Sequence, residues 1–230
     1  MNKKLSKIAL GLILATSMAI PTCAEAPIEY SVSTINARTR STYDVGEPVW
    51  EDSVTSRAAT ISVSVTSPCD QRYRSQYSDY EYAANKVVER ADDYIYKKFG
   101  IDFTSVAQPI WTSSGGNPTE MVEDARIKFG LTYNGNKTAD LMMAFCGTLF
   151  QNSSGQLTLG MGAIGKPYAC VFNDGYSQNA KTCQHEAGHT YGLYDHTGSG
   201  TCVMKQGGPD DIDTLCTSHE TQWRSSKNKY

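Results

Sequence analysis

Hydrophobic and polar residues alternate between positions 59 and 66 of the chain. Apolar side chains stand at Ile61, Val63 and Val65, with serine or threonine between them. A period of two matches a β-strand that buries one face, so the pattern predicts a first strand here. Other apolar stretches predict further strands at residues 101–111, 140–146, 157–164 and, as a last edge strand, 168–172.

Between the first two of these strands the pattern changes to the spacing of a helix. Residues 78–99 carry apolar side chains three or four positions apart, at Ala84, Val88, Ala91 and Ile95. This spacing places them on one helix face, and Gly100 follows as a stop signal. A second helix is predicted over residues 117–129, because its first turn holds an asparagine cap, a proline and a capping-box glutamate.

The order of these elements predicts the fold class. Two more helices are expected, one starting near Lys181 and one over residues 218–226, after a loop-rich stretch. Strands alternate with helices in the first part, and no internal repeat is present. We therefore expect an α+β domain in which helices back a twisted mixed sheet of four to five strands, with a loop-rich C-terminal part that ends in a helix.

The N-terminus has the pattern of a secretory signal. Three lysines in the first seven residues precede an apolar run over residues 8–20, and small residues follow. The run is too short to span a bilayer as a helix. We expect cleavage after Ala24, which gives a signal peptide over residues 1–24, a secreted extracellular protein and no membrane partner after its removal. The alternative is a lipoprotein anchored at Cys23.

Polar residues fill the stretch that follows the signal. They are rich in serine, threonine and arginine and show no sustained helical or strand period. We expect residues 25–57 to be a pro-segment or a flexible leader. The remaining residues, 58–230, are enough for one domain with a single sizeable core, and we expect a monomer.

Cysteine usage agrees with export. The chain has seven cysteines, and removal of the signal leaves six, at Cys69, Cys146, Cys170, Cys183, Cys202 and Cys216. An even set in an exported protein predicts up to three disulfides, and buried free thiols are the alternative. The pair we expect is Cys202–Cys216, around a short glycine-rich loop. A cysteine zinc site is disfavoured because no CxxC pair is present.

Charge excludes one class of partner. The net charge is −3, and removal of the three signal lysines makes it −6. No basic patch with interleaved aromatic residues is present, so nucleic acid is not an expected partner. The acidity fits solubility outside the cell.

One short run of the chain carries the candidate chemistry. His185 and His189 stand four residues apart, which places them on one face of a helix, where two imidazoles can hold one zinc ion. Glu186 lies between them, Gly192 breaks the helix, and Asp195 follows. This extended pattern is far more specific than the HExxH motif alone.

Those residue types suit hydrolysis assisted by a metal. Imidazole nitrogens and a carboxylate oxygen are zinc ligands, and three protein ligands leave a fourth position for water. Zinc lowers the pKa of that water, and Glu186 can take its proton. The sequence therefore predicts one catalytic Zn²⁺ and an endopeptidase that acts on protein or peptide substrates. The alternative is a non-catalytic secreted binding module that keeps the zinc for structure.

The run His-Glu-Ala-Gly-His-Thr-Tyr-Gly-Leu-Tyr-Asp-His, followed by Cys-Val-Met at 202–204, resembles the metzincin zinc proteases. It is most similar to the snapalysin branch, and two strands look adamalysin-like. The resemblance implies zinc ligands His185, His189 and Asp195, general base Glu186, and a methionine turn at Met204. Adamalysin-type proteins carry His-Asp where this chain carries Asp195-His196, so His196 is the alternative third ligand.

Several other polar residues have candidate roles. A carboxylate of Asp44 or Glu47 could block the zinc in a zymogen, although a solvated loop is the plainer interpretation. The acidic residues Asp210, Asp211 and Asp213 could bind calcium, and a plain acidic loop is the alternative. We expect His219 at the surface or at a helix cap, and Tyr191 exposed.

Overall fold

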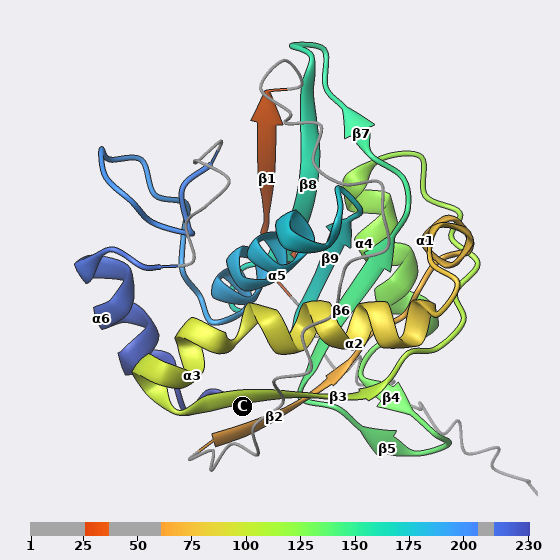
Figure 1. Ribbon diagram of the computed structural model, residues 1–230, viewed down its shortest axis with the longest axis horizontal. Helices are drawn as coiled ribbons and strands as arrows, with labels where there is room; N and C mark the ends of the chain where they lie inside the picture. The colour runs from red at the N-terminus through yellow and green to blue at the C-terminus, as the bar shows by residue number, and fades with distance from the viewer. Residues whose placement is uncertain (1–25, 37–60, 207–213) are drawn as a thin grey trace, which may run out of the picture.

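The computed structural model of the protein describes residues 26–36, 61–206 and 214–230 (Figure 1). The predicted signal peptide and several candidate residues lie outside this part of the chain, namely Cys23, Asp44, Glu47, Asp210, Asp211 and Asp213.

The helices are α1 (Gln71–Gln76), α2 (Tyr80–Ala91), α3 (Asp93–Phe99), α4 (Pro118–Lys128), α5 (Tyr176–Thr190) and α6 (Thr217–Ser226). The strands are β1 (Tyr30–Asn36), β2 (Ile61–Thr66), β3 (Ile101–Ala107), β4 (Thr132–Tyr133), β5 (Lys137–Thr138), β6 (Leu141–Cys146), β7 (Phe150–Gln151), β8 (Gln156–Ala163) and β9 (Tyr168–Phe172).

One mixed sheet organises the molecule. Its strands follow the order β1-β8-β9-β6-β2-β3, with β7 paired to β8 beside this path, while β4 and β5 form a separate antiparallel pair. The strands β9, β6, β2 and β3 run parallel, whereas β8 runs antiparallel to both β9 and β1. The α+β prediction with a mixed sheet is confirmed, and the sheet gains strands beyond four to five because β1 and β7 join it.

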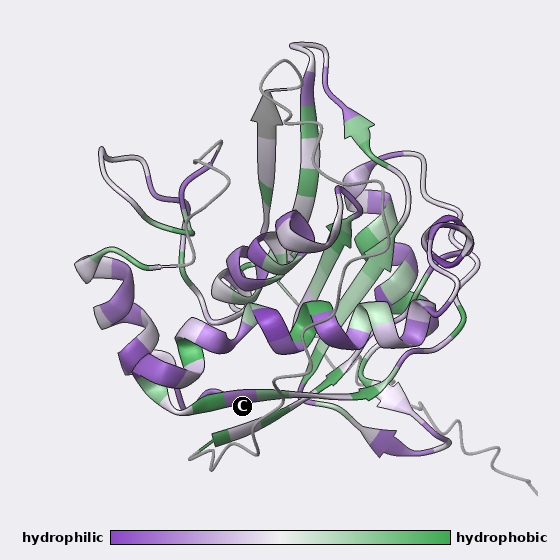
Figure 2. Cartoon of the chain, in the orientation of Figure 1, coloured by the Kyte–Doolittle hydropathy of each residue, from purple (hydrophilic) through white to green (hydrophobic). Residues whose placement is uncertain are grey.

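Helices cover both faces of the sheet. Helices α2 and α5 pack on one face and α4 on the other (Figure 1). Strand β6 is buried on both sides, with Met143 and Phe145 in the α2–α5 core and Met142 and Ala144 in the α4 core. Figure 2 shows the central strands as hydrophobic and α6 as largely hydrophilic. Burial of each large apolar side chain stabilises the fold by about 1.5–3 kcal/mol.

The predicted helix over residues 78–99 is divided at Asp92. This residue is fully buried, and its carboxylate accepts a hydrogen bond from the Phe103 backbone N–H at 2.6 Å. The bond ties the junction of α2 and α3 to β3, so a tertiary contact interrupts a continuous apolar pattern. Gly100 ends α3 with a left-handed φ of 71°, as its position predicts.

Helix α4 forms as the sequence predicts. The Asn117 side chain accepts a hydrogen bond from the Glu120 backbone N–H at 3.0 Å, and Pro118 occupies the first turn. The Glu120 carboxylate accepts from the Gly116 backbone N–H at 2.7 Å, one residue before the cap. Such a cap typically contributes about 1 kcal/mol to helix stability.

Three predictions about the elements are wrong. Strand β9 is not an edge strand, because it lies between β8 and β6. Helix α5 begins at Tyr176, five residues before the predicted start near Lys181. The stretch from Tyr30 to Asn36, expected to lack a strand period, forms β1 along the edge of β8. Among the described residues, the helices lack the combination of length and apolarity that crossing a bilayer requires.

Candidate metal centre

Helix α5 presents the predicted zinc-binding face toward the sheet. His185 and His189 lie one turn apart on it, with ring centroids 4.7 Å apart. Glu186 lies on the same buried side, and none of the three residues is exposed by more than 4%. The spacing of the motif therefore gives the geometry that it predicts.

Backbone carbonyls fix the tautomers of both imidazoles. His185 Nδ1 lies 2.7 Å from the Val203 carbonyl oxygen, and His189 Nδ1 lies 2.8 Å from that of Leu193. A carbonyl oxygen can only accept, so each Nδ1 carries the hydrogen and each Nε2 presents a lone pair. The two Nε2 atoms are 3.0 Å apart. Two lone pairs thus face each other with no hydrogen between them.

Asp195 completes this group after a sharp turn. Gly192 has a φ of 94°, which side chains rarely adopt, and its N–H donates to the His189 carbonyl. The chain then brings Asp195 Oδ1 to 3.3 Å from His185 Nε2 and 3.5 Å from His189 Nε2. The other oxygen, Oδ2, accepts from Ser31 Oγ at 2.5 Å and Gln206 Nε2 at 2.9 Å.

The donor set fits a zinc ion. Asp195 Oδ1 is buried and has no hydrogen-bond partner, and it converges with two imidazole lone pairs. Three acceptors that face one another without a donor repel each other unless a cation lies among them. Two nitrogens and one carboxylate oxygen are the ligand types of catalytic zinc sites.

Burial and neighbouring charges shift the pKa values of the residues in this cluster. Burial lowers the pKa of His185, but the adjacent carboxylates of Asp195 and Glu186 outweigh it, so that pKa is raised. Burial also raises the pKa of Glu186. At Asp195 burial opposes ionisation, yet the two adjacent imidazoles and the Ser31 hydroxyl bring its pKa well below the usual range.

Glu186 lies against the bare backbone of β8. Its carboxylate Oε1 accepts from Ser33 Oγ at 2.5 Å, while Oε2 is buried without a partner. A Cβ added at Gly160 would lie 2.4 Å from Glu186 Oε1, and one at Gly162 would lie 2.8 Å from His189 Cβ. The two glycines therefore let α5 approach β8 closely enough to bury the glutamate.

Met204 packs beneath this cluster. It is fully buried, and a Cβ added at Gly188 of α5 would lie 2.4 Å from its sulfur. The preceding residue, Val203, supplies the carbonyl that orients His185. The methionine segment thus supports the two histidines of α5 through packing and one backbone hydrogen bond.

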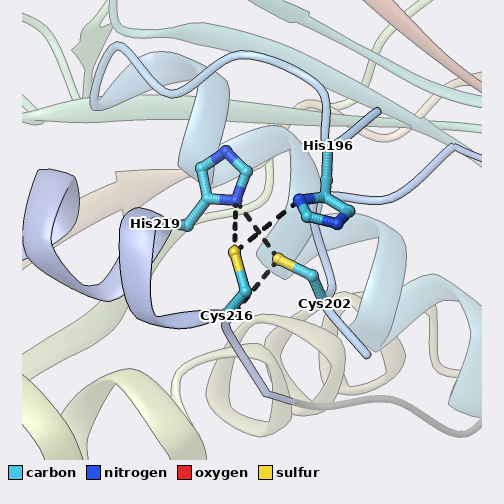
Figure 3. A group of neighbouring side chains, drawn as sticks. All are labelled: His196, Cys202, Cys216 and His219. Carbon is cyan, nitrogen blue, oxygen red and sulfur yellow. Dashed lines mark hydrogen bonds between the residues drawn. The ribbon is translucent and has the colours of Figure 1, made fainter. Parts of the chain in front are cut away.

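His196 lies apart from these three candidate ligands. Its side chain joins Cys202, Cys216 and His219 in a second group, shown in Figure 3. His219 is only 6% exposed, so its predicted place at the surface is wrong, and Tyr191 is likewise buried at 3%. The six cysteines of the described residues are free thiols, and the Cys202–Cys216 disulfide stays a prediction.

Sequence reasoning missed the polar residues that β1 brings to the centre. Ser31 and Ser33 lie opposite Gly162 and Gly160 in the register of β1 and β8, and their hydroxyls reach Asp195 and Glu186. The available signal was the alternation of serine and valine from residue 31 to 33, which is too short to predict a strand alone.

Comparisons with known proteins agree with this geometry. A reprolysin-type model of metallo-peptidase family M12 matches residues 59–225. The match contains both histidines, the glutamate, the aspartate and the methionine described above. A comparison with curated proteins returned no match.

A solved structure titled "Structure of a chaperone-substrate complex" is similar in fold. The TM-score is 0.51 at 13% sequence identity, and the alignment covers 69% of this chain and 29% of that chain. The present chain thus spans under a third of the length of that protein. Identity this low makes the likeness one of fold alone.

Proposed function

The chain belongs to metallo-peptidase family M12 and is a metzincin-type zinc endopeptidase, and we propose that His185, His189 and Asp195 hold its zinc ion. The observation that carries this assignment is the convergence of two imidazole lone pairs on an otherwise unpartnered, buried carboxylate oxygen. Asp195 as the third ligand also supports the finer, snapalysin-like assignment, which stays a proposal.

When bound, zinc supplies a Lewis acid that polarises the substrate carbonyl and lowers the pKa of water. Glu186 adjoins both histidines on α5, and its Oε2 has no other hydrogen-bond partner. We assign it the transfer of a proton from the attacking water to the leaving amine. Val203 and Leu193 hold the imidazole rings in place through their carbonyls.

The substrate site follows from the edge of the sheet. Strand β8 runs beside α5, and its outer edge is the one that β1 occupies in the antiparallel sense. An extended peptide can add to a free strand edge through main-chain hydrogen bonds. We propose that a substrate peptide takes the place of β1, with its backbone opposite Gly160 and Gly162, beside Glu186.

By the same reasoning, β1 keeps the enzyme latent. It covers the edge of β8, and its Ser33 and Ser31 hydroxyls donate to Glu186 and Asp195. Gln206 secures it by donating to the Val32 carbonyl at 2.8 Å. This assigns an inhibitory role to the predicted pro-segment, through hydroxyl groups rather than through the carboxylates of Asp44 or Glu47.

Replacement of the general base tests the peptidase assignment. Glu186→Gln removes the proton acceptor with little change in shape, so casein hydrolysis should fall by about 10²–10⁴-fold while the zinc content is unchanged. Glu120→Gln, at an exposed cap of α4, is the matched control and should keep full activity. Undiminished hydrolysis by Glu186→Gln would refute the assigned base, and zinc without any chelator-sensitive hydrolysis would favour the binding-module alternative.

A cleavable leader tests latency. A recognition sequence for an unrelated protease, inserted near residue 57, allows the same preparation to be assayed before and after cutting. We expect activity to rise once β1 can leave, and a synthetic peptide of residues 30–36 to inhibit the cut enzyme competitively. A cut enzyme that unfolds or gains no activity would make β1 a structural strand of the domain.

We also propose that the protein is secreted. Support comes from the lysines and apolar run of the first 24 residues and from the even number of cysteines that remain. Sequencing of the mature N-terminus from culture medium should find Glu25 or a residue further along the chain.

A further inference from the structure

Four metal-ligating side chains outside the catalytic centre meet in the C-terminal part of the domain. They are His196, Cys202, Cys216 and His219, and their nearest ligand atoms all lie within 4.8 Å of one another. Figure 3 shows both sulfurs and a nitrogen of each ring pointing toward the middle of the group. Three separate segments of the chain supply them, so tertiary folding assembles the group.

The distances match those of a tetrahedral site. The His219 Nδ1 atom lies 3.1 Å from Cys216 Sγ and 3.3 Å from Cys202 Sγ, and His196 Nδ1 lies 3.7 Å from Cys216 Sγ. Tetrahedral zinc with its usual bond lengths separates a sulfur and a nitrogen ligand by about 3.6 Å. Small adjustments of these side chains would therefore bring all four donors to one ion.

The backbone around the group is built to hold it. The His196 N–H donates to the Met204 carbonyl at 2.7 Å, and the Val203 N–H donates to the Thr214 carbonyl at 2.6 Å. Cys216 is the N-cap residue of α6, and its own N–H donates to Cys202 Sγ at 3.3 Å. Helix α6 then carries His219 back toward both sulfurs within its first turn.

A disulfide accounts for less of this arrangement. It would convert Cys202 and Cys216 to uncharged sulfurs, which are poor metal ligands, and leave both imidazoles directed at them without a shared cation. Burial argues the same way, since Cys202 is 2% and His219 6% exposed, and a buried imidazole needs a partner for its polar atoms. A metal ion uses all four groups at once.

We propose that His196, Cys202, Cys216 and His219 bind a second zinc ion, which is structural. Two sulfurs and two nitrogens in a tetrahedral arrangement select zinc among the common divalent metals, and four protein ligands leave no position for substrate or water. The absence of a CxxC pair argued against a cysteine zinc site. Here each cysteine instead pairs with a histidine nearby, at His196-x5-Cys202 and Cys216-x2-His219.

The second ion would stabilise the segments that position Asp195 and Met204 in the catalytic centre. His196 is the neighbour of Asp195, and Cys202 lies two residues before Met204, so both ligands adjoin residues of the first cluster. Fixing His196 to Cys202 and to α6 limits how the loop after Gly192 can move. Because a metal that binds only the folded state stabilises it, unfolding should depend on zinc at this site.

Metal content of the full-length protein gives the primary test. Protein stripped of metal, kept under reducing conditions and then dialysed against zinc should bind two zinc ions per chain. Replacement by Co²⁺ should add sulfur-to-cobalt charge-transfer absorption, which the cluster of two histidines and one aspartate cannot produce. This readout needs no catalytic activity, so it stays informative even if the proposed function fails.

Variants assign each ion to its cluster. Cys202→Ser and His219→Asn should each lose the charge-transfer absorption and one zinc ion, whereas His185→Asn should lose one zinc ion and keep the absorption. Cys146→Ser is the matched cysteine control, because Cys146 lies in the α4 core, away from both clusters. Its thiol donates a hydrogen bond to Asp70 Oδ2 at 3.3 Å. This variant should keep both zinc ions and the absorption.

Two results would overturn the proposal. The first is one zinc ion per reduced wild-type chain, with cobalt spectra that lack the sulfur band. The second is a Cys202–Cys216 linkage in the protein as isolated, seen as a mass lower by two hydrogens and as a linked peptide after digestion. Neither result depends on whether a variant folds.

Discussion

Two neighbouring residues, Asp195 and His196, enter two different clusters. The first cluster has three candidate ligands, one of them a carboxylate, and an acidic side chain beside it with an unpartnered oxygen. The second has four candidate ligands, two of them sulfurs and none a carboxylate. The comparison teaches that the number and kind of ligands distinguish a catalytic metal site, which keeps an open position, from a structural metal site, which does not.

The two clusters also differ in the parts of the chain that hold their residues together. His185, Glu186 and His189 belong to one helix that is packed on the sheet, and their spacing alone brings them together. The second cluster draws on a turn, a loop and the start of α6, and hydrogen bonds such as Val203 N–H to Thr214 carbonyl bring them together. One arrangement is therefore local in sequence and the other depends on the whole C-terminal part.

Substitutions of Asp195 and His196 themselves should have the largest effects and test most directly whether the two clusters differ. Asp195→Asn keeps the shape but removes the charge, and we expect peptidase activity to fall by about 100-fold or more with loss of the first zinc ion. His196→Asn should instead lose the second ion, lower the melting temperature and keep most of the activity per folded molecule. Zinc per chain and kcat/KM are measured for both variants.

A reversed result would be equally informative. If His196→Asn lost catalytic zinc while Asp195→Asn kept it, the third ligand would be His196, the alternative that the adamalysin-like pattern raises. The second cluster would then have to be a disulfide or a pair of thiols, because one imidazole cannot serve both sites.

A smaller effect tests the support of the first cluster. Gly162→Ala would place a Cβ 2.8 Å from His189 Cβ and 2.9 Å from the Glu186 carbonyl oxygen, so α5 must shift away from β8. We expect a loss of about 1–3 kcal/mol in the free energy of unfolding, with reduced activity and unchanged sulfur-to-cobalt absorption. Urea unfolding, a peptidase assay and the cobalt spectrum measure these three quantities.

The control is another glycine with room beside it. Gly116→Ala, exposed before α4, would meet only the flexible end of Glu120 at 3.3 Å and should leave activity and both metals as they are. Equal losses in the two variants would mean that the close approach of α5 to β8 does not matter.

The sequence predicts what is local and misses what distant segments build. Strands β6 and β8 and the cap of α4 follow from short apolar runs and from an Asn-Pro pair. Strand β1 escapes prediction, because its pairing partners lie at least 120 residues away and its own alternation is brief. The split at Asp92 likewise depends on a bond to Phe103, which no pattern within the helix reveals.

The same division applies to the candidate sites. His185, Glu186 and His189 were predicted as a group, because four residues of helix fix their relation. The place of His219 was predicted wrongly, since a lone histidine on a short helix is more often at the surface. Hydrogen bonds that join Val203 to Thr214 and Cys202 to Cys216, just before α6, help to bring it to Cys202 and His196.

The smallest expected effect is that of Met204→Leu, at a residue that connects the two clusters. Its side chain packs on Gly188 beneath the histidines, and its carbonyl accepts from the His196 backbone N–H, so it belongs to both supports. Since the side chain acts by packing alone, Met204→Leu should cost less than about 1.5 kcal/mol, while Met204→Ala should cost about 2–5 kcal/mol. Both variants should keep two zinc ions when folded, as measured by urea unfolding and metal analysis. Loss of a metal from folded Met204→Leu would show that the sulfur has a role beyond packing and that the clusters are not independent.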